Sequence, residues 1–194
     1  MVRPARDPRD ELYERYLAVP EHLRAEIIDG TLYVSPRPSP KHANAASVLG
    51  IEIGAPFQRG RGGPGGWWII DEPELQLDEK RPISPDIAGW RVERMPELPE
   101  TAFFTLAPDW VCEVLSRSTE KIDRDKKLPY YAAHRVRHVW LVDPIDKRLE
   151  VYTLGDVGGW LEVRTYEGDA TVRAAPFDAI ELDISALWAP PARR

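Results

Sequence analysis

The sequence is poor in cysteine, in long apolar runs and in net positive charge, and each shortage excludes a class of protein. It holds one cysteine in 194 residues, Cys112, so no internal disulfide can form and we expect a cytoplasmic protein. No apolar run approaches the roughly 20 residues of a membrane-spanning helix, and the first residues lack the apolar core of a signal peptide, so we expect no membrane partner. The formal net charge of −6 argues against a protein that coats nucleic acid non-specifically, although it permits a local basic patch.

Proline is abundant, and the rest of the composition is that of an ordinary globular protein. With 43% hydrophobic and 30% charged residues, the chain has the length and composition of one domain with a sizeable core. The 19 prolines predict long, stiffened connections between its elements. We expect the domain over residues 10–188, with flexible ends at 1–9 and 189–194.

A carboxylate lies inside an apolar run. Residues 110–115 read Trp-Val-Cys-Glu-Val-Leu, which is the length and composition of a buried strand. Strand side chains alternate between faces, so Val111, Glu113 and Leu115 share one face, and neither face is polar. A carboxylate buried alone is unfavourable, so Glu113 should be paired, protonated or bound to a metal. A structural salt bridge to a lysine or arginine and a metal site both satisfy this requirement.

A second carboxylate lies in another short strand. Residues 83–90 are typical of a strand entered through Pro85, which fixes its own φ and favours extended geometry in the residue before it. Taken alone, Asp86 is an ordinary turn residue, because aspartate after proline is common in turns. Together with Glu113, however, it offers the oxygen ligands that Mg²⁺ prefers.

The sequence of residues 116–134, which follow these strands, predicts a helix that carries Lys127. Ser118 or Thr119 can cap its start, and acidic residues fill its first turns. Asp123, Lys127 and Tyr131 are four residues apart, so they form one stripe on the helix. Pro129 should kink or split this helix, which leaves the direction of Lys127 open.

The remaining segments predict a mixed α/β arrangement. Helices are expected at 10–19 and at 42–53, the second ended by Gly54 and Pro56, and an Asp-Gly turn predicts a β-hairpin over 26–34. Further strands are expected at 67–77 and at 138–142, and the first of these should pair with the strand of Asp86. An antiparallel C-terminal meander is expected at 148–154, 160–166 and 171–174, followed by a closing element at 180–187. The sequence therefore predicts a single α/β domain with a mixed central β-sheet flanked by helices.

Six segments, in this order, resemble those of the Uma-type restriction endonuclease family of bacteria. They are Glu-Ile-Ile-Asp-Gly (26–30), Ser-Pro-Arg-Pro-Ser-Pro-Lys-His (35–42), Pro-Asp-Ile (85–87), Glu-Val-Leu-Ser-Arg-Ser-Thr (113–119), Asp-Arg-Asp-Lys-Lys-Leu-Pro-Tyr-Tyr (123–131) and Val-Trp-Leu-Val-Asp-Pro (139–144). No single segment is specific, but their order is, and the resemblance covers about residues 10–185. The family is placed in the PD-(D/E)XK nuclease superfamily. The resemblance implies a restriction-endonuclease-like fold and metal-dependent hydrolysis of DNA phosphodiester bonds.

The resemblance also assigns roles to particular residues. It implies that Asp86 and Glu113 bind Mg²⁺ or Mn²⁺ and that Lys127 completes the catalytic set. The lysine of the superfamily normally stands two residues after the acid, where this chain has Leu115, so the helical Lys127 takes its place. The supporting residues that the resemblance and the helix stripe suggest are Glu26, His42, Asp123 and Tyr131.

The predicted helix and its flanks are basic, although the chain as a whole is acidic. Between 117 and 137 there are seven basic and three acidic residues. Arg117 stands where the family usually has proline and adds a positive charge, while Thr31 stands where the family often has a second glutamate. A solvated helix face would explain the excess, but beside two carboxylates it suits a site that attracts a polyanion. The candidate DNA contacts are Arg117, Lys121, Arg124 and Lys126.

We therefore predict a Mg²⁺-dependent endonuclease acting on DNA. A homodimer is expected by analogy, because a nuclease with one active site per subunit usually needs two subunits to cut both strands of a duplex. The alternative is a non-catalytic nucleic-acid-binding or protein-binding module that keeps the nuclease fold, in which Glu113 and Lys127 form a buried ion pair. A carboxylate-pair glycosidase is a weaker third hypothesis, since no aromatic sugar platform accompanies the acids.

Overall fold

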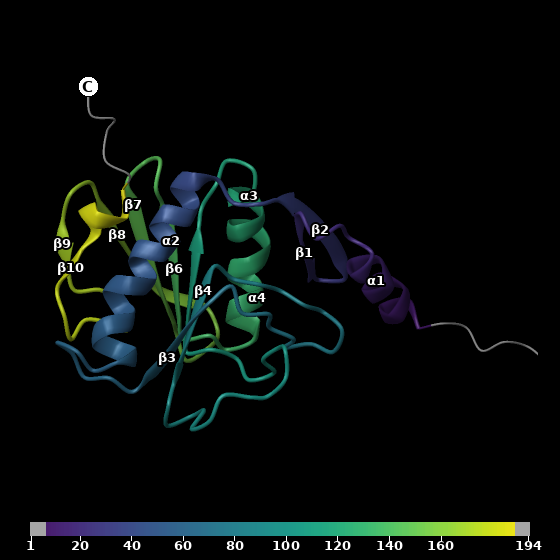
Figure 1. Cartoon of the computed structure of the whole chain (residues 1–194), viewed down its shortest axis with the longest axis horizontal. Coiled ribbons are helices and arrows are strands. Elements are labelled where there is room, and N and C mark those ends of the chain that lie inside the picture. Colours follow the sequence, from purple (N-terminus) through teal and green to yellow (C-terminus); the bar gives the residue numbers. More distant parts are fainter. Residues whose placement is uncertain (1–6, 189–194) are drawn as a thin grey trace, which may run out of the picture.

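The computed structural model describes residues 7–188, which form a single α/β domain around a six-stranded mixed sheet (Figure 1). The strands lie in the order β3-β4-β5-β6-β7-β8. Their bounds are β3 Trp67–Asp71, β4 Ile87–Arg91, β5 Trp110–Val114, β6 His138–Asp143, β7 Arg148–Leu154 and β8 Trp160–Glu167. β5 and β6 are parallel, and the other neighbouring pairs are antiparallel. The predicted fold class is confirmed.

The parallel pair β5–β6 lies at the centre of the sheet. All five residues of β5 and five of the six in β6 are buried, as expected for parallel strands covered on both faces. A parallel pair needs a crossover connection. Here the crossover segment is helical and consists of α3 Glu120–Ile122, the π-helix η2 Asp123–Lys127 and α4 Leu128–Ala133.

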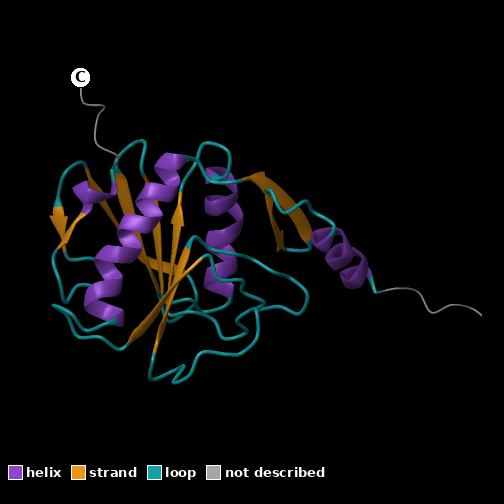
Figure 2. Cartoon of the chain, viewed as in Figure 1, coloured by secondary structure: helices purple, strands orange, loops and turns teal. Residues whose placement is uncertain are grey.

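Two hydrophobic clusters cover the two faces of the sheet. The first joins the helix α2, Pro40–Ile53, to Trp110 and Cys112 of β5. The second joins α4 to Val111 and Leu115. Figure 2 shows these helices in purple beside the orange strands. The alternation predicted for β5 is therefore confirmed, and its glutamate faces the α4 side.

An N-terminal hairpin stands apart from the six-stranded sheet. It and the preceding helix are α1 Pro8–Leu17, β1 Leu23–Ile28 and β2 Thr31–Pro36. The turn residues Asp29 and Gly30 have φ angles of 50° and 73°, which match the predicted Asp-Gly hairpin turn. Figure 1 shows α1 at the outer end of the hairpin. The Ile27 N–H ties the hairpin to the rest of the domain by donating to the Pro82 carbonyl at 2.8 Å.

The expected flexible ends can be compared with the structure only in part. Residues 1–6 and 189–194 lie outside the described residues. Pro8 and Arg9, which belong to the expected flexible segment 1–9, are instead the first residues of α1. The Asp7 side chain accepts from the Arg9 N–H at 2.9 Å and so caps this helix.

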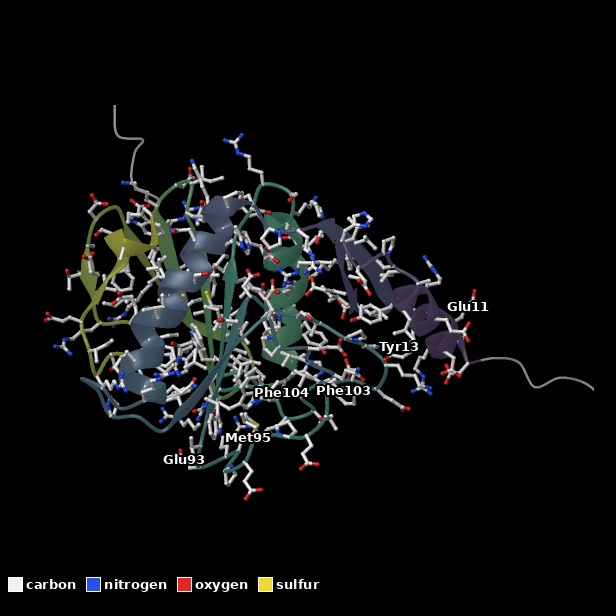
Figure 3. The ribbon with its side chains drawn as sticks, in the orientation of Figure 1. Glu11, Tyr13, Glu93, Met95, Phe103 and Phe104 are labelled. Atoms are coloured by element: carbon white, nitrogen blue, oxygen red, sulfur yellow. The ribbon has the colours of Figure 1, made fainter. Side chains whose placement is uncertain are left out.

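The long connection from β4 to β5 packs onto the sheet through aromatic residues. Phe104 stacks on Trp90 with 4.4 Å between the ring centroids, and the Trp90 indole N–H donates to the Leu106 carbonyl at 2.9 Å. Figure 3 labels Phe104 and its neighbour Phe103 on this connection, together with the buried Met95. These contacts cover the end of β4 that lies away from Asp86.

Both helical segments change geometry near a proline. As expected, α2 ends at Ile53 with Gly54 as its C-cap, and the chain then continues as the π-helix η1, Gly54–Gln58, which contains Pro56. The wider turn, closed by the Arg59 N–H on the Gly54 carbonyl at 3.1 Å, accommodates the proline that would interrupt an α-helix. The second segment is interrupted as predicted: η2 comes first, and Pro129 lies in the first turn of α4, where its missing N–H is harmless.

The C-terminal meander extends the sheet by two strands, not by three. β7 and β8 pair as predicted, but the strand expected at 171–174 does not join them. β9 Thr171–Val172 pairs instead with β10 Leu182–Asp183 in a separate two-stranded sheet, which precedes the 3-10 turn η3 Ile184–Leu187. The apolar residues of these short elements are buried with α2, and this packing accounts for the different pairing.

Candidate active site

Asp86 and Glu113 lie side by side at one end of the sheet, because β4 and β5 are antiparallel. Ile87 pairs with Cys112, so Asp86, one residue before β4, falls opposite Glu113. The Val114 N–H donates to Asp86 Oδ2 at 2.7 Å and holds this arrangement. Asp86 is 4% exposed and Glu113 is 2% exposed. The structure thus brings together the two acids that the sequence singled out.

Asp86 is held by basic groups from two other elements. Nη1 of Arg24, in β1, donates to Asp86 Oδ1 at 2.8 Å, and His42 Nε2 lies 3.1 Å from Oδ2. His42 belongs to the first turn of α2, which Ser39 caps. Burial alone would raise the pKa of Asp86, but the hydrogen bond from His42 and the charges of His42, Arg24 and Lys127 outweigh it and lower the pKa to about 2. Asp86 is therefore a carboxylate at neutral pH.

Glu113 is held by two groups of the crossover segment. Lys127 Nζ lies 3.2 Å from Glu113 Oε2, and the Tyr131 hydroxyl donates to Oε1. Burial raises the pKa of Glu113 well above its ordinary value, against the charge of Lys127, and the neighbouring acids Asp123 and Asp86 raise it further. Further positive charge beside Glu113 would therefore favour its ionised form.

Lys127 points into the cluster of acids. Its Nζ lies 2.9 Å from Glu26 Oε1, 3.2 Å from Glu113 Oε2 and 3.6 Å from Asp123 Oδ1, and the residue is 4% exposed. Burial lowers the pKa of Lys127, but the surrounding carboxylates more than offset this and raise it above the ordinary lysine value. The direction that the sequence left open is thus toward the acids, and the side chain is an ammonium.

These side chains line one pocket of about 210 Å³. Its walls come from the β1–β2 hairpin, the N-terminal turn of α2, the strand ends and the start of the crossover segment. The predicted catalytic and supporting residues that line it are Glu26, His42, Asp86, Glu113, Asp123 and Lys127. Tyr131, the remaining supporting residue, reaches the site through its hydrogen bond to Glu113.

The predicted DNA-contacting residues fall into two groups. Arg117, Lys121 and Lys126 are exposed and form no ion pair with another residue of 7–188. Arg124 is different, because its Nη1 and Nη2 donate to both carboxylate oxygens of Glu150 at 2.7 and 2.8 Å. The predicted DNA contact of Arg124 would therefore require its guanidinium to leave a bidentate ion pair with a buried acid.

Arg24 is the site residue that the sequence prediction missed. It lies two residues before Glu26 on β1, so both side chains fall on the same face of the strand. Because Glu26 was already a candidate, this spacing is the signal that could have found Arg24. Its partner Asp86 is 62 residues away in the sequence, and no local pattern announces that contact.

The donor atoms of the pocket suit a hard divalent cation. Carboxylate oxygens are the ligands that Mg²⁺ and Mn²⁺ prefer, and His42 Nδ1 is buried without a hydrogen-bond partner in residues 7–188. In the same part of the chain, no three His, Cys, Asp or Glu side chains are grouped so that they could hold an ion as they stand. Asp86 and Glu113 are occupied instead by Arg24 and Lys127. The carboxylates of the pocket fit such an ion chemically, but the ion can bind only if Arg24 or Lys127 moves away from its carboxylate.

Known proteins resemble this chain in sequence pattern and in fold. A solved structure from Anabaena variabilis ATCC 29413, described as a "putative nuclease belonging to DUF820", matches with a TM-score of 0.72 and 24% identity, over 91% of this chain and 96% of that one. That likeness shows a shared fold. No curated protein matches the chain. No helix within residues 7–188 is long and apolar enough to cross a membrane. The model of the Uma2 family, described as "Putative restriction endonuclease", matches residues 10–185, and the chain therefore belongs to that family.

Proposed function

We propose that this protein is a metal-dependent endonuclease that hydrolyses DNA phosphodiester bonds. The observation that carries the proposal is the convergence of Asp86, Glu113 and Lys127, from three separate segments, in one pocket. Phosphodiester hydrolysis needs ligands for a divalent cation and a positive donor for the phosphate, and these three residues supply both. Membership of the Uma2 family, whose description is "Putative restriction endonuclease", supports the same reaction class.

The three residues take different roles. Asp86 and Glu113, with the main-chain carbonyl of Val114, would hold Mg²⁺ or Mn²⁺, which when bound polarises the phosphate and activates water. Lys127 donates hydrogen bonds to the scissile phosphate and to the attacking water and stabilises the negative charge of the transition state. The acids around Lys127 keep it protonated, which suits a donor better than a base.

Four further residues position this set. Glu26 and Asp123 hold the Lys127 ammonium at 2.9 and 3.6 Å. Tyr131 orients Glu113 through its hydroxyl, and His42 orients Asp86 through Nε2. Loss of any of these contacts should move a catalytic group without removing it.

The surroundings of the pocket suit a polyanion. The positive end of the α2 dipole lies at the pocket, since its N-cap Ser39 and His42 of its first turn line the wall, and a helix N-terminus favours phosphate. Arg117, Lys121 and Lys126 are exposed on the segment that leads from the same wall. We propose that they contact the DNA backbone, which positions the strand without reading its sequence. A homodimer, which size-exclusion chromatography with light scattering would detect, supplies two pockets for a duplex.

A non-catalytic binding module is the second candidate, and one observation favours it. Asp86 and Glu113 each have an internal cationic partner, as structural ion pairs would. Under this hypothesis neither acid binds an ion, and removal of either one destabilises the fold.

Cleavage of plasmid and of single-stranded DNA, with Mn²⁺ or with EDTA, tests the proposal. Wild-type protein should cut with Mn²⁺ and not with EDTA, and Asp86→Asn and Glu113→Gln should not cut. Glu150→Gln is the matched control, because Glu150 is also a buried acid paired with an arginine but lies outside the pocket. It should cut at the wild-type rate. Wild-type activity in either pocket variant contradicts the assignment, and an inactive, ion-free wild type favours the binding module.

A further inference from the structure

Arg24 occupies the carboxylate that the proposed metal ion needs. Its Nη1 donates to Asp86 Oδ1 at 2.8 Å, and its Nη2 donates to the Ser84 carbonyl at 2.9 Å. The side chain is 15% exposed and lines the pocket. A guanidinium is permanently charged. Asp86 thus carries an internal monovalent cation where the proposed function requires a divalent one.

The Arg24 guanidinium and a divalent cation on the same oxygen of Asp86 would repel each other strongly. Asp86 is buried, and charges a few ångströms apart are screened weakly in such surroundings. Lys127 is held by Glu26 and Asp123 in addition to Glu113, so it keeps acidic partners when Glu113 binds a metal. Arg24 contacts Asp86 directly and competes for the same oxygen. Arg24 is therefore the cation that has to move.

A second acidic partner for Arg24 lies beside Asp86. The hairpin backbone is tied to the domain near Ile27, so the side chain is the part that can move. Glu72 Oε1 lies 3.6 Å from the same Nη1, and its half-exposed side chain offers a second acidic partner at the surface. The guanidinium fork also matches two oxygens of a phosphate, and the pocket that it lines is where the substrate phosphate would bind.

We propose that Arg24 is an exchangeable counter-ion, which neutralises Asp86 in the metal-free protein and transfers to the substrate phosphate when a divalent cation takes its place. The inference rests on the proposed function, since it requires a metal and a phosphodiester in this pocket. Arg24 is then a catalytic residue that contacts the substrate. Before metal binds, Arg24 and His42 together hold the buried Asp86.

An exchangeable counter-ion has a signature that a structural arginine lacks. Removing it should tighten metal binding, because the competitor is gone, and should slow cleavage, because the phosphate loses a donor. The two effects have opposite signs. Each should be about tenfold, which is the value of one charge-assisted hydrogen bond.

Titration calorimetry with Mn²⁺ alone, followed by cleavage rates at saturating Mn²⁺, tests the proposal. Arg24→Met removes the charge and keeps the apolar stem, and Arg24→Lys keeps the charge but loses the fork. Arg37→Met is the matched control, because Arg37 lines the same pocket but donates to the Glu21 carbonyl. Circular dichroism checks that each variant folds. If Arg24→Met does not fold, the comparison of Arg24→Lys with wild type serves as the test.

Arg24→Met should bind Mn²⁺ about tenfold tighter than wild type and cut about tenfold more slowly. Arg24→Lys should fall between the two in both assays, and Arg37→Met should bind Mn²⁺ as wild type does. If wild-type protein binds Mn²⁺ and Arg24→Met binds it no tighter, the counter-ion role is overturned while the proposed function stands. Tighter binding with an unchanged rate overturns the transfer to phosphate. If neither wild type nor any variant binds Mn²⁺, the proposed function itself fails.

Discussion

Replacement of Glu113 by glutamine separates a metal site from a structural ion pair. Glutamine keeps the shape of the side chain and removes its charge. Lys127 retains Glu26 at 2.9 Å and Asp123 at 3.6 Å, so the buried ammonium is not left unpaired. The Tyr131 hydroxyl can donate to the amide oxygen as it now donates to the carboxylate.

The expected change in the free energy of unfolding is therefore small. Burial raises the pKa of Glu113, so the fold disfavours its ionised form and a neutral amide removes that penalty. We expect Glu113→Gln to lie within about 1 kcal/mol of wild type, or slightly above it. Loss of one partner from an essential buried ion pair would instead lower stability by about 3–5 kcal/mol.

Urea unfolding followed by tryptophan fluorescence measures this difference. Lys127→Met is the comparison variant, because it leaves Glu26, Glu113 and Asp123 without their shared ammonium and should show the larger loss. Glu113→Gln should be as stable as wild type and inactive on DNA. A loss of stability in Glu113→Gln as large as that in Lys127→Met would instead show that Glu113 and Lys127 form a structural ion pair.

Three further predictions concern the lysine, the DNA contacts and pH. Lys127→Ala should abolish cleavage while Mn²⁺ binding survives, and wild-type activity in this variant would refute the role of the lysine. Adding Leu115→Lys should restore only part of the rate, since replacing this packed leucine costs about 2–4 kcal/mol of stability. Lys126→Glu should weaken DNA binding and lower the dependence of the binding constant on salt (the slope of log K against log salt concentration) by roughly 0.9, without changing the melting temperature. Arg124→Glu should instead lower the melting temperature by breaking the ion pair with Glu150. An unchanged salt slope in Lys126→Glu would place the DNA elsewhere. Burial and nearby arginines lower the pKa of His138 from 6.5 to about 4, so the unfolded chain binds this proton more readily and stability should fall as pH drops from 6.5 through 4. His138→Asn should flatten that part of the plot of stability against pH, and an equally steep loss in the variant would contradict this role of His138.

Local patterns were sufficient for the parts of the site that lie on strands. The side-chain period of two placed Glu113 on the face of Val111 and Leu115, and the structure has all three on the α4 side. The same period fixes the opposition of Asp86 and Glu113 once β4 and β5 pair. The hairpin followed from its Asp-Gly turn, because few other sequences adopt that geometry.

Long-range contacts and irregular helices were beyond the sequence. A π-turn shifts the helical register, and nothing in the residues around Pro129 told how far Lys127 would rotate. The partner of Arg124 is on β7, and that of Arg24 is the residue before β4, so only the folded chain shows that each arginine is paired with a buried carboxylate. The two-residue strand β9 was assigned to the wrong sheet because packing against α2, not propensity, decides its pairing.

Anomalous diffraction from crystals soaked in Mn²⁺ would show directly whether the pocket holds an ion. We expect one strong Mn²⁺ peak in the pocket, bonded to both Asp86 and Glu113, with the Arg24 guanidinium displaced from Asp86 Oδ1. Asp86→Asn crystals treated in the same way should lack the peak. A pocket without a peak, in which Arg24 and Lys127 keep their present acidic partners at saturating Mn²⁺, would show that Asp86 and Glu113 are not metal ligands.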